Sequence, residues 1–174
     1  MDHIKIFDKS HDITERTIDL IVAPVNKRLE TSGSHKPLDY VIYNHRYALR
    51  KLHEVVPNKD KVAYGDVYLI PEEHGAQSSL MYAVLSEACS TDTKALKHFY
   101  QTSLSAAAAE GYQSIRFPSL STGVFKYPMD QVVAAGLEEA ITFTKFREIQ
   151  FYCYNDVYFQ KFNTQLQKLK AWRK

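Results

Sequence analysis

The most informative stretch of this chain is FPSLSTGVFKYP, which runs from Phe117 to Pro128. Apolar residues leading up to Phe117 predict a strand, and the pattern after Pro128 predicts a helix, so the small residues between them form a strand–helix loop. Backbone N–H groups and hydroxyls in such a loop, together with the positive end of the helix dipole, suit a phosphate or pyrophosphate. In an open α/β sheet, ligands bind at this carboxyl end of the strands. The loop therefore predicts an anion site, although a plain strand–helix turn has similar residues.

Length and composition predict one globular domain spanning residues 1–174. Hydrophobic residues make up 45% of the chain and charged residues 24%, which is typical of a soluble protein. No apolar run approaches the roughly 20 residues that a transmembrane helix needs. The first seven residues, Met1–Phe7, predict a strand instead of a signal peptide because they have no apolar core and no cleavage site. We therefore expect no membrane association.

Charge and cysteine content indicate which partners and which cellular compartment to expect. The net charge of +2 argues against nucleic acid as a partner, and the basic residues at 168–174 are typical of a solvated helix end. Cys89 and Cys153 have no metal-ligand spacing, so we expect two buried free thiols and no metal site. We also expect no cofactor. Buried free thiols indicate a reducing compartment such as the cytoplasm.

Strand and helix patterns alternate along the chain. After the first strand we expect strands at Ile18–Val22, Asp66–Ile70, Leu80–Leu85, Ile115–Pro118 and Ile149–Tyr154, and helices at Leu38–Val55, Thr93–Glu110, Met129–Phe146 and Val157–Trp172. Gly111 follows the second of these helices, where a C-cap glycine is expected. Strands joined by helices of this length imply right-handed crossovers. The sequence thus predicts a three-layer α/β/α sandwich around a mostly parallel sheet.

The loop resembles a known phosphate-binding loop. With FP before it and YP after it, the run STGVF resembles the second phosphate loop of macrodomains, the ADP-ribose-binding modules, and no Walker or Rossmann glycine pattern is present. The resemblance extends from about Ile4 to about Leu169. It implies a mixed sheet with an antiparallel element between Asp66 and Leu85. It also implies diphosphate contacts from the loop residues Ser121, Thr122, Gly123, Val124 and Phe125, with Phe125 packing under the distal ribose.

The resemblance also assigns residues to the adenine end of the ligand. Asp12 and Ile13 match an Asp-Ile-Thr motif whose carboxylate accepts the adenine amino hydrogen, although an aspartate here is also typical of a helix N-cap. Tyr154 follows the last strand, where the family places an aromatic ring against the adenine. Asn155 beside it is expected to hydrogen-bond the proximal ribose or the base. A tyrosine at a strand end is otherwise an ordinary core-edge residue.

At the distal ribose the sequence departs from the family pattern. Asn26 matches the second asparagine of an Asn-Ala-Ala-Asn motif, but Ala23 replaces the first. The glycine run that should follow is reduced to Gly33. Asp39 aligns with the aspartate that orients or activates water near the distal ribose C1″ in the de-ADP-ribosylating branch, although a first-turn helix acid is also expected there. The resemblance therefore gives Asn26 and Asp39 as catalytic residues and Gly33 as a ligand contact.

Three functions are compatible with these residues. The first is a hydrolase that cleaves ADP-ribosyl linkages on a modified protein, nucleic acid or metabolite, with Asn26 and Asp39 positioning the water. The second is a reader that binds ADP-ribose without turnover, which the change at Ala23 favours. The third is a module for another anionic ligand such as RNA, which only the basic tail supports. We expect the protein to act as a monomer.

Overall fold

The computed structural model describes residues 1–8, 10, 18–30, 46–71, 78–86, 93–120 and 125–172. Its strands are β1 (Ile4–Phe7), β2 (Leu20–Val25), β3 (Val67–Ile70), β4 (Ser79–Val84), β5 (Ser114–Pro118) and β6 (Glu148–Tyr152). Its helices are α2 (Arg46–Val55), the 3-10 turn η1 (Lys59–Lys61), α3 (Thr93–Ala109), α4 (Met129–Ala140) and α5 (Asp156–Trp172).

The described strands form one mixed sheet in the order β1-β6-β5-β2-β4-β3. Neighbouring strands are parallel from β1 to β4, and β3 alone among them runs antiparallel, pairing with β4. The prediction of a mostly parallel sheet with an antiparallel element between Asp66 and Leu85 is confirmed. Strands β2, β4 and β5 are buried along their whole length, as their nearly continuous apolar sequences predict.

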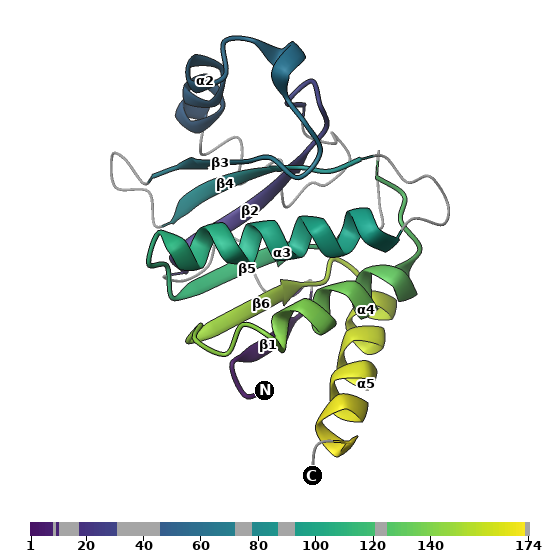
Figure 1. Ribbon diagram of the computed structural model, residues 1–174. Helices are drawn as coiled ribbons and strands as arrows, with labels where there is room; N and C mark the ends of the chain where they lie inside the picture. The colour runs from purple at the N-terminus through teal and green to yellow at the C-terminus, as the bar shows by residue number, and fades with distance from the viewer. Residues whose placement is uncertain are drawn as a thin grey trace.

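Helices cover both faces of the sheet (Figure 1). One hydrophobic cluster joins α3, α4 and α5 to the face that carries Leu20, Phe117 and Phe151. A second cluster joins Ala48 and Leu52 of α2 to the opposite face. The architecture is thus the predicted three-layer α/β/α sandwich. Within the part of the chain that the structure describes, none of the helices combines the length and apolarity that a membrane span needs.

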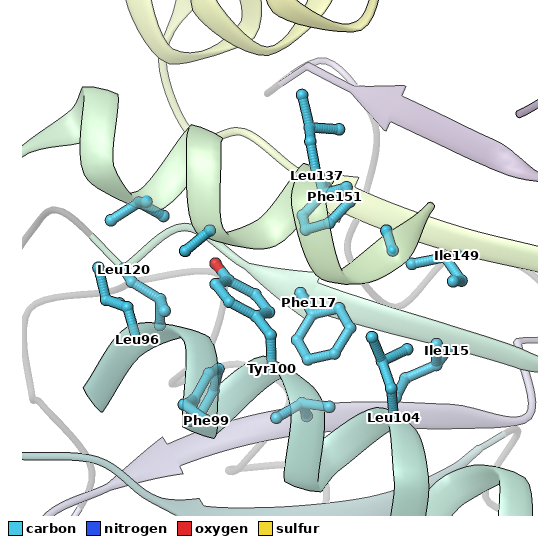
Figure 2. Close-up of a cluster of buried hydrophobic side chains, with 14 of the residues drawn as sticks. Leu96, Phe99, Tyr100, Leu104, Ile115, Phe117, Leu120, Leu137, Ile149 and Phe151 are labelled. Carbon is cyan, nitrogen blue, oxygen red and sulfur yellow. The ribbon is translucent and has the colours of Figure 1, made fainter. Parts of the chain in front are cut away.

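Aromatic rings form the centre of the larger cluster (Figure 2). The ring of Tyr100 from α3 contacts Phe117 of β5 edge-on, with centroids 5.0 Å apart. Phe117 stacks on Phe151 of β6 at 5.8 Å, and Phe151 stacks on Phe162 of α5 at 4.7 Å. Such pairs add about 0.5–1.5 kcal/mol each beyond the burial of their area. The rings thus fix α3 and α5 to the two strands whose carboxyl ends carry the predicted site.

Helix α4 is shorter than the sequence pattern predicts. We expected a helix to Phe146, but α4 ends at Ala140 and Ile141 is its C-cap. The next residues include Thr142 and Phe143, which are weak helix formers, and the Thr142 side chain bonds the carbonyl of Glu139. Ending here lets Phe146 turn back into the core, where it is buried.

The other predicted elements agree with the structure to within a few residues. Strand β2 begins and ends later than Ile18–Val22, and α2 accounts for residues 46–55 of the helix predicted from Leu38, whose earlier part lies outside the described residues. Gly111 has a φ of +82° just after α3, as predicted for a C-cap glycine.

Candidate functional site

The sheet has a topological switch point between β2 and β5, which are neighbours, because the connections that follow these two strands lead to opposite sides of the sheet. After β2 it continues through α2, on one face, to β3 and β4. After β5 it continues through α4, on the other face, to β6 on the opposite side. Such a switch point creates a crevice outside the carboxyl ends of the two strands, and ligands of open α/β sheets bind in it.

Among the described residues, strands β2 and β5 are paired at one end only. The Asp19 carboxylate accepts hydrogen bonds from the backbone N–H of Gln113 and Ser114, at 3.0 and 2.9 Å, just before the strands begin. Their pairing then covers Leu20 with Ile115 and Ile21 with Arg116 and ends there, although β2 continues to Val25. The strands therefore part toward their carboxyl ends.

Pro24 fits this separation. The carbonyls of Asp19 and Val25 accept hydrogen bonds from Ser79 and Leu85 on the β4 side, both at 2.9 Å. Because bonding directions alternate along a parallel strand, Pro24 faces β5, where no pairing remains. A proline, which has no N–H, costs no ladder hydrogen bond at this position.

Asn26 follows β2 and closes a tight turn. Its side-chain oxygen accepts the backbone N–H groups of Arg28 and Glu30 at 2.9 and 3.0 Å, and its Nδ2 donates to the Glu30 carboxylate at 3.1 Å. The side chain of Ala23, which replaces the family's first asparagine, is fully buried. The amide of Asn26 thus stabilises its own turn, and its predicted role at the distal ribose stays a prediction.

Ser119 joins the carboxyl ends of β5 and β6. Its buried hydroxyl donates to the carbonyl of Tyr152 at 2.8 Å and accepts the backbone N–H of Tyr154 at 3.2 Å. The sequence pattern predicts no role for this residue, although it lies inside the quoted loop motif. Through these two bonds the start of the phosphate loop and the predicted adenine-stacking residue are fixed to each other.

The residues after the loop are fixed to the end of β4. The Tyr127 hydroxyl donates to the carbonyl of Ser86 at 2.8 Å and also bonds the Ser86 hydroxyl at 2.9 Å. Phe125 is 1% exposed and belongs to the larger hydrophobic cluster, so its side chain lies in the core. Its proposed packing under the ribose stays a prediction.

Tyr154 and Asn155 lie beyond β6. Tyr154 is half-buried and contacts both hydrophobic clusters, at the sheet edge where the adenine is expected. The Asn155 side-chain oxygen accepts the backbone N–H of Tyr158 at 2.8 Å, which is the bond of a helix N-cap, here that of α5. The Asn155 side-chain NH₂ group is not used by this cap.

Cys153, between β6 and Tyr154, is a buried free thiol, as predicted. Burial raises the pKa of this thiol from 9.0 to about 12, with a smaller contribution from the Asp8 carboxylate. The thiol is therefore neutral and a poor nucleophile at physiological pH. Cys89 lies outside the described residues.

The sequence of this chain is similar to those of known proteins. The model of the macro domain family matches residues 22–135. The chain belongs to the macro domain family. A macro domain-containing protein of Mesorhizobium japonicum is 31% identical over 136 residues, which cover 75% of this chain and 72% of that protein. An O-acetyl-ADP-ribose deacetylase of Citrobacter rodentium is 40% identical over 73 residues, which cover 37% of this chain and 39% of the deacetylase.

Solved macrodomain structures share the fold. A mutant of the Oceanobacillus iheyensis macrodomain matches with a TM-score of 0.78 at 22% identity, covering 97% of this chain and 92% of that chain. The Trypanosoma brucei macrodomain in complex with ADP-ribose matches with a TM-score of 0.74 at 22% identity, covering 94% of this chain and 69% of that chain. At this identity the likeness shows the fold alone.

Several predicted site residues of this macro domain lie outside the described residues: Asp12, Ile13, Gly33, Asp39, Ser121, Thr122, Gly123 and Val124. The described ends of β2, β5 and β6 nevertheless place Asn26, Ser119 and Tyr154 at the same edge of the sheet. Among the residues that the structure describes, no group of three His, Cys, Asp or Glu side chains could hold a metal ion.

A separate groove of about 440 Å³ lies between α4 and α5 of the macro domain. It is lined by Asp130, Val133, Ala134, Gln160, Lys161, Thr164, Gln165 and Lys168. A salt bridge between Lys161 and Asp130, at 2.5 Å, crosses it. None of the predicted ligand contacts lines this groove, which belongs to the helical surface and not to the switch point.

Proposed function

We propose that this macro domain binds ADP-ribose along the carboxyl edge of its sheet and hydrolyses the bond that joins ADP-ribose to an acceptor. We also propose that residues 1–174 form one domain around this site. The observation that carries the proposal is the order of the strands. The predicted contacts follow the order in which the parts of ADP-ribose are joined.

The order of the strands matches the order of the adenine, the diphosphate and the distal ribose in ADP-ribose. The adenine contacts Asp12 and Tyr154 follow β1 and β6, the diphosphate loop follows β5, and Asn26 follows β2. These four strands are consecutive neighbours in the sheet. Paired strands lie about 4.8 Å apart, so three such spacings give roughly 14 Å, and the separation of β2 from β5 at their carboxyl ends adds to this distance. An extended ligand with its base at β1 and β6 and its distal ribose at β2 would meet each contact in turn.

Relatives support both parts of the proposal. The Trypanosoma brucei macrodomain has been solved with ADP-ribose, and curated relatives that share part of the sequence are O-acetyl-ADP-ribose deacetylases. The name of these enzymes describes removal of a group attached to ADP-ribose, which is the class of reaction proposed for this chain. We place the chemistry at the distal ribose because the predicted catalytic residues Asn26 and Asp39 are expected there.

The proposed chemistry uses few groups. Asp39 orients or activates a water molecule, and Asn26 helps to hold the distal ribose so that this water faces the bond to be cleaved. Backbone N–H groups of residues 121–125 bind the diphosphate and stabilise negative charge that develops nearby. The neighbouring β5 and β6 ends, joined through Ser119, keep the nucleotide half of the ligand in place.

A reader that binds ADP-ribose without turnover is the second candidate. Two observations at β2 favour it: the first asparagine of the family motif is Ala23, and the oxygen of Asn26 is occupied by two N–H groups of its own turn. Loss of two amide contacts would weaken the alignment of the reacting sugar more than the binding of the nucleotide, because the other contacts hold the adenine and the diphosphate.

Binding and turnover are tested in sequence. We expect isothermal titration calorimetry to show ADP-ribose binding to the wild type and a large loss in Asp12→Ala. If neither ADP-ribose nor ADP binds or raises the melting temperature, the proposed function is wrong. A release assay on an ADP-ribosylated protein then separates the candidates: turnover abolished in Asp39→Ala supports the hydrolase, and tight binding without any release supports the reader.

A further inference from the structure

The turn after β2 displays two cations. Leu29 is buried with a φ of +60°, and its N–H bonds the carbonyl of Asn26 at 2.9 Å. The N–H of Asn26 in turn bonds the carbonyl of Glu30 at 3.1 Å. Anchored in this way, the turn leaves the side chains of Lys27 and Arg28 exposed at its tip.

The turn before β3 displays an aromatic ring. Tyr64 is 52% exposed. The Asp66 carboxylate accepts the N–H of Ala63 at 2.8 Å, and the N–H of Gly65 bonds the carbonyl of Val84 at 2.9 Å. Gly65 has a φ of +90°, and the ring of His98 from α3 lies where a side chain on Gly65 would be. The exposed Tyr64 ring therefore belongs to a turn whose backbone is held by hydrogen bonds on both sides of Tyr64.

These two turns meet at the carboxyl edge of the sheet. Val25 and Val84, the last residues of β2 and β4, are paired neighbours, and Gly65 is bonded to Val84. The Lys27 ammonium lies 4.3 Å from the centroid of the Tyr64 ring, which is a cation–π contact. Lys27 and Tyr64 thus share one exposed surface, and Arg28 is exposed beside Lys27 in the same turn; these three residues are here named the acceptor platform.

We propose that the acceptor platform binds the polypeptide to which ADP-ribose is attached. The inference rests on the proposed function, which places the adenine at β1 and β6 and the distal ribose at β2. The next strands along the edge are β4 and β3. A group bonded to the distal ribose and leaving the cleft in the same direction would reach the acceptor platform, which begins one residue after Asn26.

The chemistry of the acceptor platform favours a polypeptide over a nucleic acid. Tyrosine and arginine are enriched at protein interfaces and among the residues that contribute most to binding. Glu30 lies in the same turn as Lys27 and Arg28, and Asp66 lies in the neighbouring turn with Tyr64, so two carboxylates offset the charge of the two cations. A nucleic-acid strand would instead require a surplus of cations to replace its counterions.

The test compares free ADP-ribose with a peptide that carries one ADP-ribose through a non-hydrolysable bond. Calorimetry is done on the wild type, Arg28→Ala and Tyr64→Ala, with Trp172→Ala as the matched control, since Trp172 is 91% exposed at the far end of α5. An oligonucleotide carrying one ADP-ribose through the same bond is the third ligand.

We expect the wild type to bind the modified peptide more tightly than free ADP-ribose. Arg28→Ala and Tyr64→Ala should each weaken peptide binding about fivefold to tenfold and leave ADP-ribose binding unchanged, and Trp172→Ala should change neither. Equal affinities of the wild type for the peptide and for free ADP-ribose would overturn the inference, as would unchanged peptide binding in both variants. A preference for the oligonucleotide would overturn the polypeptide assignment. Absence of ADP-ribose binding by the wild type would instead overturn the proposed function and, with it, the inference.

Discussion

Replacing Ser119 by alanine tests whether the carboxyl ends of β5 and β6 are held together as described. The substitution removes the donor to the Tyr152 carbonyl and the acceptor of the Tyr154 N–H, with bond lengths of 2.8 and 3.2 Å. A hydrogen bond contributes about 1 kcal/mol net, and loss of the acceptor of the half-buried Tyr154 N–H adds a cost at the lower end of the roughly 1–3 kcal/mol known for buried groups. We therefore expect the free energy of unfolding to fall by about 2 kcal/mol. For a chain of this length, the melting temperature should fall by about 4–8 °C.

Urea unfolding followed by far-ultraviolet circular dichroism measures this change. Ser103→Ala is the matched control: its hydroxyl is also buried, but it bonds the carbonyl of Phe99, which the helix already uses as an acceptor. That variant should stay within about 0.5 kcal/mol of the wild type because no buried N–H loses its acceptor. Similar midpoints for Ser119→Ala and Ser103→Ala, with equal urea dependence, would refute the assignment of Ser119 as the link between the two strand ends.

Three further outcomes are expected. Gly65→Ala should lower the free energy of unfolding by about 2 kcal/mol, because its φ of +90° is strained for alanine and the new Cβ would overlap the His98 ring; adding His98→Ala should recover part of the loss, and an unchanged single variant would contradict this. Asn155→Ala should lower stability by about 1 kcal/mol in urea and Asn155→Asp should not, whereas equal losses would argue against the cap. The pKa of the Cys153 thiol is raised from 9.0 to about 12 in the folded protein, so between these pH values the thiol ionises in the unfolded chain but not in the folded one. The stability contributed by the neutral buried thiol is therefore complete below pH 9 and is lost as the pH rises toward 12. The stability difference between the wild type and Cys153→Ala should therefore shrink by about 1 kcal/mol from pH 8 to pH 10, and a constant difference would contradict the raised pKa.

The fold could be predicted from the sequence because its signals are local. Apolar runs such as the one in β2 and turn glycines such as Gly111 depend on neighbouring residues only, and both have the structure that they predict. The order of strands and helices then leaves few topologies once right-handed crossovers are required. The overlong prediction for α4 fails for a related reason: Phe146 continues the apolar pattern, but it reaches the core from a turn and not from the helix.

The arrangement of the site could be predicted only in part, since its contacts join residues far apart in the chain. The loop motif identified the edge of the sheet, but nothing in the sequence near Ser119 indicates its bonds to Tyr152 and Tyr154. The contact between Lys27 and Tyr64 likewise depends on the pairing of β2 with β4 and of β4 with β3. Periodicity describes which face of an element is buried, and such pairings between elements follow only from the folded sheet.

A crystal structure of the complex with ADP-ribose would show whether the ligand lies across the carboxyl ends of the strands. We expect density for the ligand across the carboxyl ends of β6, β5 and β2, with the adenine beside Tyr154, the diphosphate over the loop at 121–124 and the distal ribose beside Asn26. A ligand bound in the opposite direction, or bound in the groove between α4 and α5 while this edge stays empty, would contradict it.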